Sequence, residues 1–333
     1  MIMNKIKLMG GVRIDAIDIL KFLAALLITN SHMNGLYPPK FEALATGGAL
    51  GDSCFFFCSG FLLIQSRGGD FFNWYKRRVN RIFPTLFAIA IVSIVAFGKN
   101  PAFKSVILSE NAWFVQAILV FYAAFWFVKR FLSDKMWGVI TAVGIISLIW
   151  FAFFWDKSVS VFMVGTYLRW PLFFCVMLIG AITAKNYRQG IQHKLMISFL
   201  FFILLMGLFY GYQILEKKKM MLCNYEIVIA PILFLAVYEL FWICSNERVV
   251  SFYRKKGIYA VVFFISSLCF EIYLSQHYLF PIGKSLIRLF PLNIIICFVL
   301  IVGVAYIVKV LGNFISQTFK SDNYEWKKMV KIP

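Results

Sequence analysis

The chain has 333 residues, of which 61% are hydrophobic and 19% are aromatic. Charged residues make up only 15%, against about 25% in soluble domains, so a soluble protein is excluded and the composition predicts a polytopic membrane protein. The net charge of +19 does not indicate a nucleic-acid partner. The cations lie in short patches between apolar segments, as topology signals at an anionic lipid bilayer do.

Ten apolar segments come close to the roughly 20 residues that a membrane-spanning helix requires. They lie at about 14–36, 46–66, 82–98, 112–128, 136–154, 165–184, 195–215, 225–244, 257–280 and 293–315. We therefore expect an all-α fold of about ten transmembrane helices. Without an internal repeat or a long linker, residues 1–333 are expected to form a single integral-membrane domain. The first segment lacks a small-residue cleavage site and is expected to stay as an anchor.

The distribution of basic residues predicts the orientation of these spans. Most of the 34 Lys and Arg residues fall on the side of the N-terminus, so we expect both termini to be cytoplasmic, in a multi-pass protein of the cell's inner membrane. The run Lys217–Lys219 is an exception on the outer side, where it either faces an anionic substrate or is a tolerated loop charge. The seven cysteines include no CxxC pair, which indicates neither a disulfide framework nor a metal site.

The first span, IDAIDILKFLAALLITNSHMNGL at 14–36, is unusually polar. Lys21 and His32 are eleven residues apart, so on a helix they lie on nearly one face and about 16 Å apart along the axis. Polar groups of this kind inside a membrane indicate function. Histidine titrates near neutral pH and can act as a general base toward a hydroxyl. Asp18, three residues before Lys21, can pair with it and lower the cost of burial.

Other polar residues of the apolar spans have weaker signals. His277 is expected near the outer end of the ninth span; for both it and His32 the alternative is a neutral core histidine bound to a backbone carbonyl. His193 falls in a short loop and is expected to be solvated, without a role. Glu271 lies in mid-span, where a carboxylate needs a partner or a water-filled cavity. Trp113 is interpreted mainly as a membrane-belt residue.

The densest polar stretch is RGGDFFNWYKRRVNRIFP at 67–84. Pro84 suits the first turn of the third span. Arg78 and Arg81 are three residues apart, and Arg77 and Arg81 are four apart, so they are neighbours on a helix. A basic cluster at a helix start can bind an anion, and guanidinium matches phosphate well. The alternative is anchoring to lipid headgroups.

Five stretches occur in a characteristic order: Lys21-x10-His32, FFFCSGFLL at 55–63, KRRVNRIFP at 76–84, AWFVQAIL at 112–119 and CFEIYLSQH at 269–277. Together they resemble R/K-x10-H, FF-x-x-SGFLL, KRR-x-x-R-I-x-P, LWFL and SY-x-IYL-x-H of the acyltransferase-3 family of integral-membrane acyltransferases. The resemblance covers about the whole chain and is closest to stand-alone members. It departs at Cys269 and Phe270, which replace the family's Ser-Tyr pair.

The resemblance implies transfer of an acyl group, most simply acetyl, from cytoplasmic acyl-CoA to a hydroxyl of an extracytoplasmic or lipid-linked glycan. Acyl-CoA is then a donor substrate, and no permanently bound cofactor is expected. His32 would deprotonate the acceptor hydroxyl or relay the acyl group, and Lys21 would position the donor. The CoA phosphates would be bound by Arg77, Arg78 and Arg81; the further candidates are Asp18, Ser59, Trp113, Glu271 and His277.

Two other functions are compatible with a polar membrane helix. A transporter or flippase of a glycan or acyl precursor would use Lys21, His32 and Glu271 as a charge or proton pathway. The sequence lacks the inverted repeat and the pair of Gly/Pro-broken spans that are typical of such proteins. A non-catalytic scaffold gives no reason for Lys21 and His32 to share one face of a buried helix.

Overall fold

The computed structural model describes residues 13–99, 101, 106, 113–163, 165–319 and 325–330, and this part of the chain contains helices and no strand. The all-α prediction is confirmed. The long helices are α1 (Asp15–His32), α2 (Gly48–Ile64), α3 (Phe71–Phe97), α5 (Trp113–Phe131), α6 (Met136–Phe154), α7 (Arg169–Arg188), α8 (Leu195–Lys218), α9 (Ile229–Ser245), α11 (Lys256–Ser267), α12 (Cys269–Ser285) and α13 (Leu292–Thr318). The shorter elements are η1 (Asn34–Leu36), η2 (Pro39–Leu44), η3 (Met220–Val228), α10 (Glu247–Tyr253), η4 (Ile287–Leu289) and α14 (Trp326–Val330).

Each predicted span coincides with one of these helices or with a pair of them. In the described residues, eight helices are long and apolar enough to cross a membrane, or nine when the bent pair α11 and α12 counts as one span. α1 is not among them, because its 18 residues include Asp15, Asp18 and Lys21. The chain is thus a multi-pass membrane protein. The cytoplasmic position of both termini stays a prediction. Five of the cations on which it partly rests lie outside the described residues: Lys5, Lys7, Lys104, Lys320 and Lys331.

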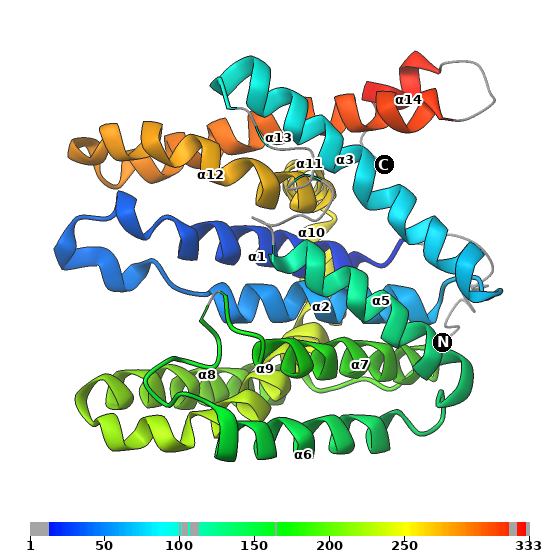
Figure 1. Cartoon of the computed structure of the whole chain (residues 1–333), viewed down its shortest axis with the longest axis vertical. Helices are drawn as coiled ribbons and strands as arrows, with labels where there is room; N and C mark the ends of the chain where they lie inside the picture. Colours follow the sequence, from blue (N-terminus) through cyan, green and yellow to red (C-terminus); the bar gives the residue numbers. More distant parts are fainter. Residues whose placement is uncertain are drawn as a thin grey trace.

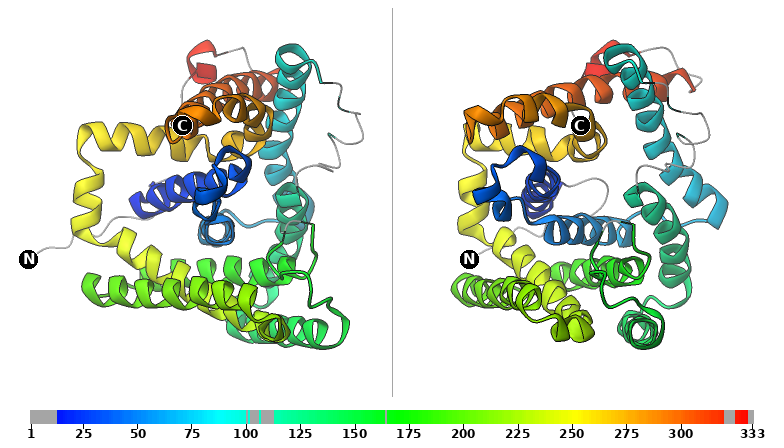
Figure 2. Two further views of the ribbon diagram at one scale, coloured as in Figure 1. Left: turned by 90° about the vertical axis from the view of Figure 1, so that its left-hand side faces the viewer. Right: turned by 60° about the vertical axis from the view of Figure 1, so that its left-hand side comes forward.

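α1 and α2 form an antiparallel pair in the middle of the molecule (Figure 1). α7 packs on α2 and α9 packs on α1, while α11 and α12 contact α1 from the other side. α10 runs along one edge and joins the layer of α9 to the layer of α11 (Figure 2). The polar helix α1 therefore has protein neighbours on several sides, which lowers the cost of placing its charged residues in a membrane.

The contact between α2 and α7 depends on two glycines. A Cβ atom on Gly60 would lie 1.7 Å from the carbonyl oxygen of Met177, and one on Gly180 would lie 2.1 Å from that of Phe57. Only a residue without a side chain permits such an approach of two backbones. The glycine of the FFFCSGFLL stretch therefore has a structural role in the central packing.

Two expectations about helix boundaries were wrong. α3 begins at Phe71, where the Asp70 side chain caps it by accepting a 2.9 Å hydrogen bond from the backbone N–H of Asn73. Pro84 consequently lies inside the helix and not in its first turn. The ninth span is not one helix, because α11 and α12 meet at Leu268 with a bend of 74°.

Candidate active site

His32 ends α1, and its imidazole contacts two consecutive residues of α12. The side-chain nitrogen Nε2 of Gln276 lies 2.8 Å from His32 Nδ1. The ring of His277 lies with its centroid 5.3 Å from that of His32. Gln276 is buried, His32 is half-buried and His277 is exposed. The structure thus brings together the two histidines of the apolar spans, and the partner it gives His32 is a side-chain amide and not a backbone carbonyl.

The Gln276 amide determines which His32 nitrogen can accept a proton. When Nε2 of the amide donates to His32 Nδ1, the imidazole proton resides on its other nitrogen. When the amide is turned over, its oxygen accepts from Nδ1–H, and His32 Nε2 carries a free lone pair. Within the described chain, the Gln276 oxygen is buried without a hydrogen-bond partner. The turned amide satisfies this oxygen and gives His32 the tautomer of a general base.

The sequence suggested that Asp18 pairs with Lys21, but in the structure it does not. Its carboxylate forms an ion pair with Arg13, which lies two residues before α1. The same carboxylate accepts a 3.3 Å hydrogen bond from Tyr253 of α10. Asp15 similarly pairs with Arg254 at 2.7 Å. These contacts attach the start of α1 to the α9–α11 connection, so the role of Asp18 is structural.

Lys21 is half-buried between α2 and α12. The thiol of Cys269 donates a 3.4 Å hydrogen bond to its backbone oxygen, and its ammonium interacts electrostatically with Cys58 and Cys269. Its side chain has no hydrogen bond or ion pair with another described residue. A cation in this position is available to a bound substrate.

Arg169, the first residue of α7, was not among the candidates from the sequence. It is 1% exposed, and its guanidinium carbon lies 3.3 Å from the centroid of the Trp113 ring. It interacts electrostatically with Asp52, His32 and Tyr273. Trp113 is therefore not simply a membrane-belt residue. The sequence signal that could have identified this site is the position of a cation within the apolar segment 165–184.

The basic stretch at the start of α3 is divided between two environments. Arg77 and Arg81 are exposed, whereas Arg78 is 7% exposed and its guanidinium lies 4.9 Å from the Trp74 ring. Arg78 and Arg81 are neighbours on the helix, as expected, but they do not share one environment. Three residues turn a helix by about 300°, so the two side chains are offset by about 60°, which here places one on the buried face and the other on the exposed face.

Two cations from other helices join the basic stretch at the C-terminal end of α2. Lys129 of α5 donates hydrogen bonds to the backbone oxygens of Ser66, at 2.6 Å, and Leu63, at 3.0 Å. Arg188 of α7 donates to Gln65 Oε1 at 3.0 Å. The carbonyl groups at a helix C-terminus carry partial negative charge that attracts cations. The cluster thus has members that the linear motif did not include, from segments far apart in sequence.

A family model for an acyltransferase domain, that of acyltransferase-3 proteins, matches residues 14–310. The chain belongs to the acyltransferase-3 family. It is accordingly a membrane acyltransferase. Searches of curated proteins and of solved structures gave no significant match. Against the pattern SY-x-IYL-x-H, Gln276 of this acyltransferase stands at the histidine position, and His277 follows it.

The remaining candidates of the acyltransferase have partners of their own. Glu271 forms a buried ion pair with Lys309 of α13, at 2.9 Å, which supplies the partner that a mid-span carboxylate requires. The Ser59 hydroxyl donates to the Phe55 carbonyl of its own helix at 3.0 Å. Neither side chain has a hydrogen bond with His32. His193 is not simply solvated, because its ring stacks on Trp242 with centroids 4.6 Å apart.

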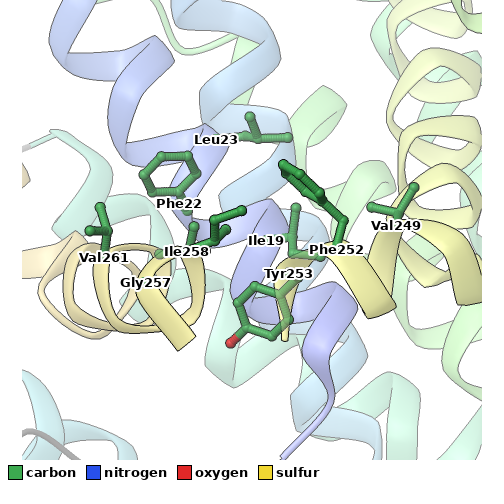
Figure 3. A pocket seen from close by; sticks show the side chains of 10 residues that line it. Ile19, Phe22, Leu23, Val249, Phe252, Tyr253, Gly257, Ile258 and Val261 are labelled. Carbon is green, nitrogen blue, oxygen red and sulfur yellow. The ribbon is translucent and has the colours of Figure 1, made fainter. Parts of the chain in front are cut away.

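Two pockets of the acyltransferase adjoin α1. A cavity of about 600 Å³ beside its first half is lined by apolar residues of α1, α10 and α11, among them Phe22 and Phe252 (Figure 3). A cavity of about 1130 Å³ at the C-terminal end of α1 includes Ser31 and has a mixed polar and apolar lining. Its other polar side chains are Asn34, Glu42, Thr46, Lys157, Ser158, Ser160, Tyr210, Gln213, Glu216, Lys217 and Glu226.

The run Lys217–Lys219 has a local explanation in this structure. Lys217 and Lys218 are the last two residues of α8, and Lys219 follows as its C-cap. Cations at a helix C-terminus are favoured by the helix dipole. Lys217 also lines the polar cavity, so the run is not merely a tolerated loop charge.

Proposed function

We propose that this acyltransferase moves an acyl group, most simply acetyl, from cytoplasmic acyl-CoA to a hydroxyl of an extracytoplasmic or lipid-linked glycan, in the inner membrane. The observation that carries the proposal is the contact of His32 with Gln276 and His277 at the end of α1. Membrane helices rarely contain such a polar cluster without a function.

The donor is expected to bind at the opposite end of α1. The cations Arg77, Arg78, Arg81, Lys129 and Arg188 there offer several positive groups to the CoA phosphates, which guanidinium groups bind well. Lys21 lies about 16 Å along the helix from His32, a span comparable with the length of the pantetheine arm. The thioester can therefore reach His32 from the donor side while the acceptor approaches from the other, which brings the two reactants together.

The chemistry follows from the Gln276-bound tautomer of His32. His32 Nε2 takes the proton of the acceptor hydroxyl as its oxygen forms a bond to the thioester carbonyl carbon. The tetrahedral intermediate collapses with cleavage of the carbon–sulfur bond, and the proton passes to the CoA thiolate. The products are an ester and CoA with a free thiol. An acyl-His32 relay reaches the same products in two steps.

The polar cavity at the end of α1 supports a saccharide acceptor. Its walls combine hydrogen-bond acceptors, such as Glu42 and Glu216, with donors, such as Lys157, Lys217 and Gln213. Sugar hydroxyls both donate and accept hydrogen bonds, so a mixed lining matches them better than it matches an apolar chain or a simple ion. Ser31, next to His32 in the chain, forms part of the wall.

The test is acyl transfer by the purified full-length protein. Labelled acetyl-CoA is incubated with extracts of surface polysaccharide, and the acceptor is analysed by mass spectrometry for a gain of one acetyl group. His32→Ala is expected to lower the rate by about 10²- to 10⁴-fold, as for the loss of a general base, and His193→Ala to leave it unchanged. Transfer retained by a folded His32→Ala protein would remove His32 from the mechanism.

One observation favours transport as the second candidate function. The bent pair α11 and α12 has the geometry of a broken span or of a re-entrant loop, and broken spans are a feature of many secondary transporters. A transporter or flippase would move labelled glycan precursor across vesicle membranes without consuming acyl-CoA. Release of CoA thiol that depends on His32 would instead favour the transferase.

A further inference from the structure

Arg169 combines deep burial with unused hydrogen-bonding capacity. Its Nε and Nη2 atoms are buried and have no hydrogen-bond partner in the described part of the chain. Both atoms lie on one edge of the guanidinium, where their N–H bonds point in nearly the same direction, the arrangement that binds oxyanions with two hydrogen bonds. The face of the group is covered by Trp113 at 3.3 Å. The edge is therefore the part of Arg169 whose hydrogen bonds are unsatisfied.

An unpartnered buried cation is costly unless something else compensates for it. Contact with the Trp113 ring offsets part of this cost, but it does not replace two missing hydrogen bonds. An oxygen ligand that accepts from Nε and Nη2 would supply them. Burial of this edge beside the His32 cluster thus points to a group that arrives with the substrate.

The surroundings of Arg169 distinguish between a permanent anion and a developing one. Asp52, in the first turns of α2, interacts electrostatically with Arg169. An ionised Asp52 would repel a second full anion, such as an acidic sugar. His32 also interacts electrostatically with Arg169, which places the guanidinium in the neighbourhood of the proposed general base.

We propose that Arg169 binds the carbonyl oxygen of the acyl donor and stabilises the negative charge that develops on it. This inference rests on the proposed function. As the acceptor oxygen attacks the carbonyl carbon and His32 takes its proton, the carbonyl electron pair moves to the oxygen, and Arg169 Nε–H and Nη2–H donate to it. When the carbon–sulfur bond breaks, the pair returns to the carbonyl and the thiolate leaves. Preorganised donors of this type often make the largest contribution to acyl-transfer catalysis.

The experiment measures CoA thiol release by the purified full-length protein, with acetyl-CoA as donor and polysaccharide extract as acceptor. Arg169→Gln is expected to lower kcat by about 10²- to 10³-fold, as for the loss of an oxyanion donor. The effect on KM for acetyl-CoA is expected to be smaller, because the hydrogen bonds to the carbonyl oxygen strengthen as its charge develops. Arg169→Lys retains the positive charge over Trp113 but not the paired donors, so a smaller loss is expected. Lys255→Gln is the matched control, since Lys255 also lies over a ring, that of Phe252, at 5.0 Å.

Each outcome decides between the proposal and its alternatives. Unchanged kcat in folded Arg169→Gln protein would overturn it, and so would a loss confined to the KM for acceptor, which would indicate an anionic acceptor. If Arg169→Gln does not fold, the test is kcat of Arg169→Lys, because that variant keeps the buried cation. A lower kcat would support the proposal, and an unchanged kcat would overturn it. Absence of thiol release by the unaltered protein would refute the proposed function itself, whereas release that is insensitive to Arg169 refutes only this inference.

Discussion

Substitution of Gly60 by alanine tests the central packing of α2 on α7. The new Cβ would lie 1.7 Å from the Met177 carbonyl oxygen, and Cβ contacts under 3.0 Å are essentially never observed. The two helices must therefore part by about 1.3 Å, from 1.7 to 3.0 Å. A gap of this size forfeits a quarter to a half or more of the dispersion energy across it. Neither contacting atom belongs to a flexible side chain, so local adjustment cannot relieve the contact.

The expected loss of unfolding free energy exceeds that of ordinary overpacking. Overpacked cores lose about 1–3 kcal/mol, and for Gly60→Ala we expect about 3 kcal/mol or more. With about 2–4 °C per kcal/mol in soluble domains, the unfolding midpoint should fall by about 6 °C or more. Gly144→Ala in α6 is the control, because nothing lies within 4 Å of its added Cβ. There alanine should be neutral or stabilise the helix by about 0.5–1 kcal/mol.

The cysteines provide the assay. All but Cys223 of the seven free cysteines are buried, so a dye that fluoresces on reaction with thiols reports unfolding when the detergent-solubilised protein is heated. Cys58 of α2 and Cys175 of α7 belong to the two helices that the substitution separates. Equal midpoints for Gly60→Ala and Gly144→Ala would refute the argument that backbone contact determines this packing.

Two further predictions concern polar groups outside the His32 cluster. Glu271→Gln leaves Lys309 without its carboxylate partner. Losing one partner of a buried ion pair costs about 3–5 kcal/mol of unfolding free energy. Because the Lys309 side chain is 21% exposed, we expect a loss at the lower end of this range, measured with the same thiol assay. Recovery is expected when Lys309→Met is added, and a double variant as unstable as the single one would argue against the pair. Asp70→Ala should speed amide hydrogen exchange in the first turn of α3. The Asn73 hydrogen bonds lower the pKa of Asp70, so this protection is complete above the usual carboxyl pKa and disappears as the pH falls through the lowered value; a difference from the unaltered protein that persists in acid would contradict the capping role.

Hydropathy was sufficient to locate the helices of the apolar segments. A span of about 20 apolar residues has no other stable conformation in a bilayer, and all ten predicted segments are helical. The start of α3 was missed because residues 71–81 are too polar to count as a span, although Asp70 is a recognisable cap. The break at Leu268 was missed because it contains neither Gly nor Pro, the residues that usually mark one.

The site was only partly predictable for a different reason. His32 and Lys21 share one helix, so their spacing alone places them on one face. Arg169, Gln276 and Asp52 belong to three other helices, and no periodicity within a single segment reveals which helices meet. Each was a polar residue in or beside an apolar segment. Such a residue stands out in the sequence, but the sequence does not show which other residues it contacts.

The bend at Leu268 explains how two distant stretches of sequence form one site. α12 contacts α1 at Lys21 through Cys269 and at His32 through Gln276, so the two helices run in the same direction. Because the 74° bend starts α12 beside Lys21, the segment 269–277 follows α1 from Lys21 to His32. The first and last of the five family-like stretches thus lie against each other. A substitution in either stretch is therefore expected to affect acyl transfer.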